Sequence, residues 1–210
     1  MTNNYGIIAP FYDLLKKIVF GQSLIKAECI HLNEVRPESK LLVIACGSSE
    51  FLEHIEISKF SSITCIDKSA KMCQKSRYRR NKLKQAEKIQ IKESEFESFT
   101  STQKYDVIAL PFFLDSQKPT DIHVILDKCH TMLADQGSLI ITDFNSLSSR
   151  KSNILLIKIM YIFFRISTNI PVLTLFDRRN FLDLMKWKQE NSYLSPKELI
   201  FSIKLKKIPI

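Results

Sequence analysis

The chain has 210 residues, of which 45% are hydrophobic and 25% charged, and a formal net charge of +9 at pH 7. This composition is typical of a soluble globular protein with one full core. The first residues lack the charged and apolar regions of a signal peptide. The most apolar segment, 154–176, is interrupted by Lys158, Arg165 and Pro171, which excludes a membrane-spanning helix. We expect a single cytoplasmic domain over residues 1–210.

The positive charge leaves two interpretations open. It could serve an anionic partner such as nucleic acid, a membrane surface or an acidic substrate. A lysine-rich solvated surface is favoured, because the charges are spread along the chain with one cluster at 77–84. The five cysteines show no C-x-x-C spacing and do not group with the four histidines. We therefore expect free buried thiols and no metal.

The predicted elements alternate between strands and helices. Residues 5–35 have apolar side chains at helical spacing, with breaks at Pro10 and Gly21. An apolar run at 41–45 predicts a buried strand that leads into a tight turn and a helix N-terminus. Further strands are expected at 62–66, 88–92, 105–110 and 138–142, and further helices at 69–84 and 120–133. This order predicts an α/β protein with a mostly parallel, doubly wound sheet and helices on both faces.

The segments after residue 145 follow a different pattern. We expect helices at 154–166 and 181–186 and a partly alternating strand at 199–205. The first of these helices is apolar around most of its circumference and carries interspersed basic residues. Two interpretations remain open for it: an insertion that covers an apolar substrate and touches a membrane surface, or a helix buried beneath the C-terminal strands.

Four segments fall where an open α/β sheet places its ligand, at the carboxyl ends of the strands. The first is the turn at 45–49, which contains Gly47. Asp67 follows 20 residues later at the end of the second strand, where a carboxylate suits the paired hydroxyls of a ribose. The acidic segment 93–95 could accept from an exocyclic amine. The apolar segment 110–114 could form the wall of a substrate site.

These motifs together resemble a known family. The segment 41–49 resembles a motif with an apolar pair, an acid, an apolar residue and Gly-x-Gly-x-Gly. Residues 63–72 resemble the next strand with its ribose-binding acid, and 105–111 and 126–143 resemble the fourth strand and the helix, turn and strand that follow. On these segments, most of residues 5–145 are similar to class I S-adenosylmethionine-dependent methyltransferases, in particular to members that act on small molecules, lipids and quinones.

The resemblance implies a Rossmann-like methyltransferase fold with seven strands and S-adenosyl-L-methionine as cofactor. It implies an N-terminal helical lid at 5–35, a cofactor-binding core at 40–145, and an insertion helix with a C-terminal hairpin at 146–210. The implied cofactor-binding residues are Ala45, Cys46, Gly47, Ser48, Asp67, Lys68, Glu95 and Leu110. The implied substrate-binding residues are Tyr5, Tyr12, Phe112 and Phe113. No catalytic residue is assigned, and the candidate bases are Asp115, His123 and Asp143.

Three residues depart from the family pattern. Val43 stands at the position of the acid, and Ala45 and Ser49 stand at the first and last glycine positions. We expect a methyltransferase that acts on a small or lipid-like apolar acceptor, with peripheral membrane contact as a further expectation. The alternative is a catalytically weak or inactive protein of the same fold that serves as a binding or scaffold partner.

Two other functions are disfavoured. A nicotinamide-dependent oxidoreductase would need the three-glycine fingerprint, which this chain lacks. Nucleic acid is not expected as a substrate, because segment 110–113 lacks the amide and hydroxyl of a base-methylating site. The sequence leaves the oligomeric state open.

Overall fold

The structure is a computed structural model that describes residues 22–145, 152, 154–155 and 186–208. Most of the expected N-terminal lid, with Tyr5 and Tyr12, lies outside the described residues. The same holds for the helices expected at 154–166 and 181–186, apart from residues 154, 155 and 186.

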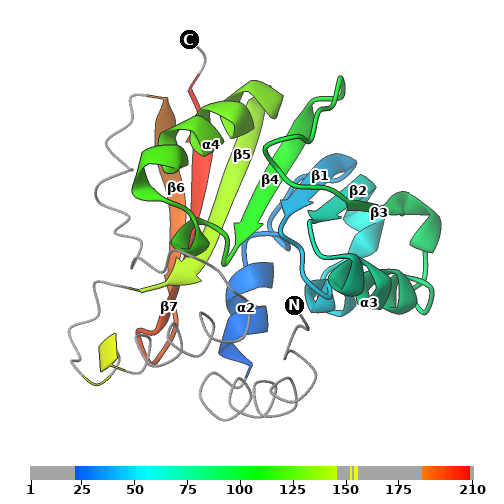
Figure 1. The fold of residues 1–210 in the computed structure, drawn as a ribbon, viewed down its shortest axis with the longest axis horizontal. Coiled ribbons are helices and arrows are strands. Elements are labelled where there is room, and N and C mark those ends of the chain that lie inside the picture. Colours follow the sequence, from blue (N-terminus) through cyan, green and yellow to red (C-terminus); the bar gives the residue numbers. More distant parts are fainter. Residues whose placement is uncertain (1–21, 146–151, 153, 156–185, 209–210) are drawn as a thin grey trace, which may run out of the picture.

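A single seven-stranded sheet forms the centre of the molecule (Figure 1), in the order β3-β2-β1-β4-β5-β7-β6. The strands are β1 (Ser39–Ile44), β2 (Phe60–Asp67), β3 (Ile89–Glu93), β4 (Tyr105–Pro111), β5 (Leu133–Phe144), β6 (Trp187–Leu194) and β7 (Ile200–Lys207). Strands β1 to β5 pair in parallel, whereas β7 is antiparallel to both β5 and β6. This confirms the predicted seven-stranded, mostly parallel sheet with its C-terminal hairpin.

The helices are α2 (Ser23–Cys29), α3 (Ala70–Arg80) and α4 (Pro119–Met132), with short 3-10 helices η1 (Glu50–Glu53), η2 (Ile57–Lys59), η3 (Ala86–Lys88) and η4 (Leu114–Ser116). The Ser69 side chain caps α3 by accepting from the Met72 N–H at 3.4 Å. Helix α4 begins with Pro119, whose missing N–H costs nothing at a first helical position.

Several boundaries differ from the sequence-based prediction. The helix expected after the turn at 45–49 is only the single 3-10 turn η1, and α3 ends at Arg80 rather than at residue 84. Strand β5 begins at Leu133, five residues earlier than predicted, with an irregular register before Ser138. Gly137 lies in this irregular stretch, where an added Cβ would come within 2.9 Å of the Ala134 carbonyl oxygen. That close approach explains why a glycine stands there.

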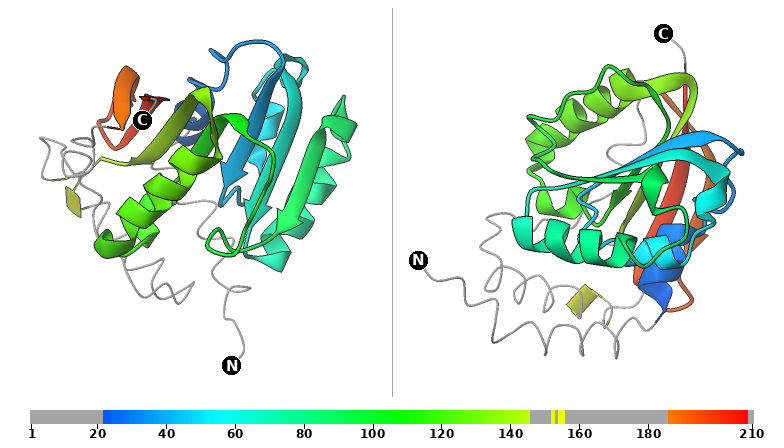
Figure 2. Two further views of the ribbon diagram at one scale, coloured as in Figure 1. Left: turned by 90° about the horizontal axis from the view of Figure 1, so that it is seen from above. Right: turned by 90° about the vertical axis from the view of Figure 1, so that its right-hand side faces the viewer.

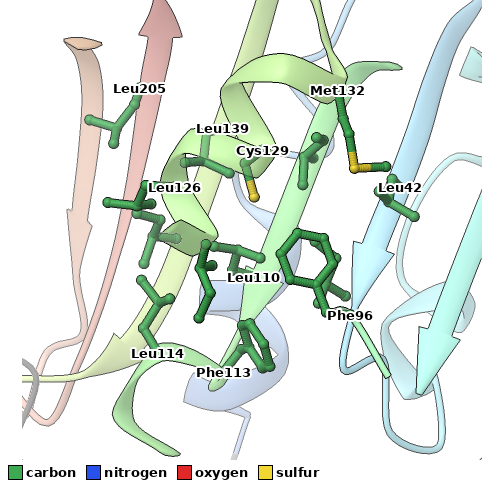
Figure 3. Close-up of a cluster of buried hydrophobic side chains, with 14 of the residues drawn as sticks. Leu42, Phe96, Leu110, Phe113, Leu114, Leu126, Cys129, Met132, Leu139 and Leu205 are labelled. Carbon is green, nitrogen blue, oxygen red and sulfur yellow. The ribbon is translucent and has the colours of Figure 1, made fainter. Parts of the chain in front are cut away.

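Helices cover both faces of the sheet (Figure 2), as predicted. Alternate residues of β1 point to opposite faces: Leu42 and Ile44 pack beneath α4, and Leu41 and Val43 pack toward α2, η1 and α3. All four are at most 1% exposed, which is why the strand is a continuous apolar run. Figure 3 shows part of the first of these two core clusters, in which side chains of β1, β4, β5 and β7 lie under α4.

No helix among the described residues is both long and apolar enough to cross a membrane.

Candidate functional site

The turn that follows β1 has an unusual backbone. Ala45, Gly47 and Ser49 have φ angles of +56°, +56° and +53°, so all three adopt the left-handed conformation. These are the three positions at which the related motif has glycine. A Cβ makes this conformation unfavourable at Ala45 and Ser49.

The space beside the middle of this turn is open. A Cβ added to Gly47 would meet no atom within 4 Å, so the lack of a side chain here is not explained by packing within the protein. The turn and the end of β2 lie at the same edge of the sheet, because Ile44 of β1 pairs with Ile66 of β2.

Asp67 holds the turn to the end of β2. Its Oδ2 accepts the Gly47 N–H at 2.8 Å, and its Oδ1 accepts the Ser69 N–H at 2.9 Å. The carboxylate is half-buried, and each oxygen keeps a further lone pair. The structure thus brings together Asp67 and the residues expected to surround the cofactor from Ala45 to Ser48.

Two side chains of α3 that the sequence had not singled out also reach the turn. The Ser76 and Ser49 hydroxyls lie 2.6 Å apart, and the Arg79 guanidinium donates to the Ser48 carbonyl. The only sequence signal was the spacing of Ser76 and Arg79, which places them on one side of a helix. That spacing does not indicate that this side of α3 contacts the turn.

The other expected cofactor residues are less closely grouped. Lys68 and Glu95 are exposed near the ends of β2 and β3. Leu110 is only 1% exposed, and its side chain belongs to the core beneath α4 (Figure 3). Only the backbone of Leu110 is therefore available to a ligand. Val43, at the position of the missing acid, is buried in the opposite core cluster.

The two expected substrate-wall aromatics have different environments. Phe113 is buried and packs edge-on against Phe96, with ring centroids 6.1 Å apart. Phe112 is half-buried, and its ring lies 4.9 Å from that of Phe144. The φ angle of Phe112 is +49°, which is uncommon for a bulky residue, and its N–H donates to the Thr142 carbonyl at 2.7 Å.

Two of the three candidate bases form a buried carboxyl pair. Asp143, at the end of β5, accepts the Asp115 N–H at 3.1 Å and the Phe144 N–H at 2.8 Å. Burial, followed by the nearby Asp115 charge, raises the pKa of Asp143 well above its ordinary range. The third candidate, His123, is exposed on α4.

Three thiols lie close to the turn. Cys46 is part of the turn, Cys73 lies in α3, and Cys65 lies in β2 and is fully buried. The Cys46 thiol and burial together raise the pKa of Cys65, and burial is the main cause that raises the pKa of Cys73 to about 11. All five cysteines are free and buried, and no metal-ligand cluster occurs among the described residues.

Comparison with known proteins identifies the core of the chain. Residues 42–139 match the sequence family described as "Methyltransferase domain". No curated protein sequence matches the chain.

Solved structures match over most of the chain. A SAM-dependent methyltransferase from Methanosarcina mazei is 18% identical, with a TM-score of 0.66, over 86% of this chain and 98% of that one. An N-methyltransferase from Bradyrhizobium japonicum, also solved with S-adenosyl-L-homocysteine, is 14% identical, with a TM-score of 0.59, over 90% of this chain and 94% of that one. A cyclopropane synthase from Mycobacterium tuberculosis is 10% identical, with a TM-score of 0.67, over 89% and 84%. These matches confirm the Rossmann-like methyltransferase fold.

Proposed function

We propose that this chain, which carries a methyltransferase domain at residues 42–139, transfers a methyl group from S-adenosylmethionine to a small or lipid-like apolar acceptor. The family and its methyl donor were expected from the sequence, and the domain match confirms them. The acceptor class and the residue roles are the parts that we propose.

The observation that carries the proposal is the shape of the turn after β1. Three left-handed residues at alternate positions turn the chain sharply between β1 and η1, and the side of Gly47 that has no side chain faces open space. Backbone can approach a ligand closely at such a position. Ala45, Cys46, Gly47 and Ser48 would line the cofactor there.

Asp67 is suited to hold the ribose. It is fixed by the backbone N–H groups of Gly47 and Ser69, so its carboxylate is oriented before any ligand arrives. A carboxylate accepts up to about four hydrogen bonds, and two are used within the protein. The remaining lone pairs can accept from two neighbouring hydroxyls. Lys68, Glu95 and the Leu110 backbone complete the proposed cofactor site.

The chemistry asks little of the protein beyond alignment. The bound cofactor supplies a methyl group on a sulfonium, which leaves as a neutral thioether when an acceptor attacks in line. The residues of the site therefore need to hold the two reactants in line and keep water out. A base is needed only for an acceptor that must lose a proton, and the candidates are Asp115 in η4 and Asp143 near the end of β5.

An apolar acceptor is supported by the end of β4. Phe112 is held in a left-handed conformation and exposes part of its ring, with Phe144 beneath it. A strained residue at the carboxyl edge of a sheet is a candidate for a functional contact. Phe113, with Tyr5 and Tyr12 from outside the described residues, would extend this wall. One structural match is named a mycolic acid cyclopropane synthase, so the fold accommodates apolar acceptors.

The alternative of an inactive binding protein rests on Val43, Ala45 and Ser49. The left-handed backbone at positions 45 and 49 removes most of the support for this alternative.

A transfer assay decides between an active enzyme and a binding protein. Purified protein is incubated with methyl-labelled S-adenosylmethionine and a panel of quinols, phenols and fatty acyl lipids, with polar amines as the matched set. We expect label only in apolar acceptors. Labelled amines alone would contradict the acceptor class, and label in neither set would support a binding role.

A further inference from the structure

We propose that Ser76 and Arg79 of α3 are positioning residues that hold the cofactor turn in its left-handed conformation at Ser49, where the related motif has glycine. This inference rests on the proposed function for its importance to cofactor binding. It concerns the turn itself, which exists without a ligand.

The need for such a support follows from the backbone. A residue with a Cβ is disfavoured at positive φ, yet Ser49 has φ +53° and is only 1% exposed. Without a compensating contact, the chain at this position would relax toward negative φ. That change would reorient the peptide groups on either side and disturb the turn around Gly47.

Ser76 provides a contact that only a hydroxyl at position 49 can use. The two Oγ atoms lie 2.6 Å apart, and Ser76 is completely buried in the middle of α3. A buried hydroxyl without a partner is costly, so each serine favours the conformation in which the bond forms. Glycine at position 49 would need no support and could make no such bond.

Arg79 provides the second contact. Its Nη1 donates to the Ser48 carbonyl, and its Nε donates to Glu53 Oε1 at 2.8 Å. The guanidinium is therefore fixed at both ends, by the turn and by η1. Because donation from a charged group is stronger than a neutral hydrogen bond, it fixes the direction of the Ser48 peptide group.

The turn is held at Gly47, Ser48 and Ser49 when these contacts are added to that of Asp67. The Gly47 N–H donates to Asp67, the Ser48 carbonyl accepts from Arg79, and the Ser49 hydroxyl meets Ser76. The Ser49 N–H also donates to the Cys46 carbonyl at 2.9 Å. Side chains from α3 and β2 thus do what backbone freedom does in a glycine-rich turn.

The test is a double-mutant cycle in the full-length protein, read by hydrogen exchange of the amides at 46–49 and by titration with S-adenosylhomocysteine. We expect Ser76→Ala to speed exchange and weaken affinity about tenfold, the loss of about one hydrogen bond. In a Ser49→Gly background we expect Ser76→Ala to change the exchange rate and the affinity by less than about twofold each. A role in overall stability alone would not depend on the residue at position 49.

A second pair of variants tests Arg79. We expect Arg79→Gln to speed exchange at 46–49 about tenfold. Arg80→Gln removes the same charge from the same helix, and Arg80 donates to the neighbouring Asn81, so exchange at 46–49 should stay unchanged. The inference is overturned if Ser76→Ala acts equally, or not at all, in both backgrounds, or if the two arginine variants match. If the wild-type protein binds no S-adenosylhomocysteine, the proposed function fails, and the exchange data still decide the role of α3.

Discussion

The carboxylate of Asp67 makes two contacts whose loss can be separated by experiment. Asp67→Ala removes both acceptors, at 2.8 Å from the Gly47 nitrogen and 2.9 Å from the Ser69 nitrogen. A hydrogen bond to a charged group contributes about 1.5–3 kcal/mol, and water can replace part of it because the site is half-exposed. We therefore expect the free energy of unfolding to fall by about 2 kcal/mol. For a chain of this size that lowers the Tm by about 4–8 °C.

Asp67→Asn keeps one acceptor oxygen and should lose about half as much stability. Affinity for S-adenosylhomocysteine should fall about 100-fold in Asp67→Ala, the loss of two charge-assisted hydrogen bonds to the ribose. Urea unfolding and calorimetric titration measure the two effects. Glu87→Ala is the matched control, because it removes the same charge from an exposed position at the other end of β3. The reasoning is refuted if both Asp67 variants unfold and bind like Glu87→Ala.

Three further predictions concern the same edge of the sheet. Ala45→Gly should raise the free energy of unfolding by about 0.5 kcal/mol, because relief of the left-handed strain exceeds the entropy cost of glycine. The control Ala70→Gly in α3 should lower it by a similar amount. Equal losses of stability for the two variants in urea unfolding would contradict this. The pKa of Asp143 is raised from its ordinary value of 3.8, so its contribution to stability is greatest at low pH and is lost as pH rises through the raised pKa. Between pH 4 and pH 8, the free energy of unfolding of the wild type should therefore fall relative to that of Asp143→Asn. A difference between the two proteins that stays constant with pH would rule out the raised pKa. The pKa values of Cys29 and Cys73 are raised to about 12 and 11, and all five thiols are buried. Iodoacetamide at about pH 7.5 should therefore label no thiol in the native protein and all five in urea, as measured by intact mass. Rapid labelling of the native protein would disprove the burial.

The strands could be predicted because their physical signal is local. A parallel strand buried on both faces must be apolar throughout, and the runs in β1, β2 and β4 end at residues that break the pattern. Strand β5 was placed too late because Gly137 looks like the end of a loop. The glycine is instead required by the close approach of the Ala134 carbonyl oxygen. That approach depends on the register of β5, which the sequence does not show.

The site could be predicted only in part, for the same reason. The position of Asp67 follows from the end of a strand, but its bond to Gly47 depends on how β1 and β2 are paired. Ala45 and Ser49 depart from the glycine pattern, and local propensity disfavours left-handed residues with a Cβ. The contact that supports Ser49 is tertiary, since Ser76 lies 27 positions away along the chain. Leu110 was predicted to bind the cofactor, and because its side chain packs in the core, only its backbone is open to that role.

Calorimetric titration of the wild-type protein with S-adenosylmethionine is the most direct test of the whole account. The open space beside Gly47 and the fixed carboxylate of Asp67 predict saturable binding at one site per chain, with a Kd between about 1 µM and 1 mM. The same titration of Asp67→Ala should give a Kd about 100-fold higher than that of the wild type. Absence of binding to the wild-type protein at millimolar cofactor would contradict the account.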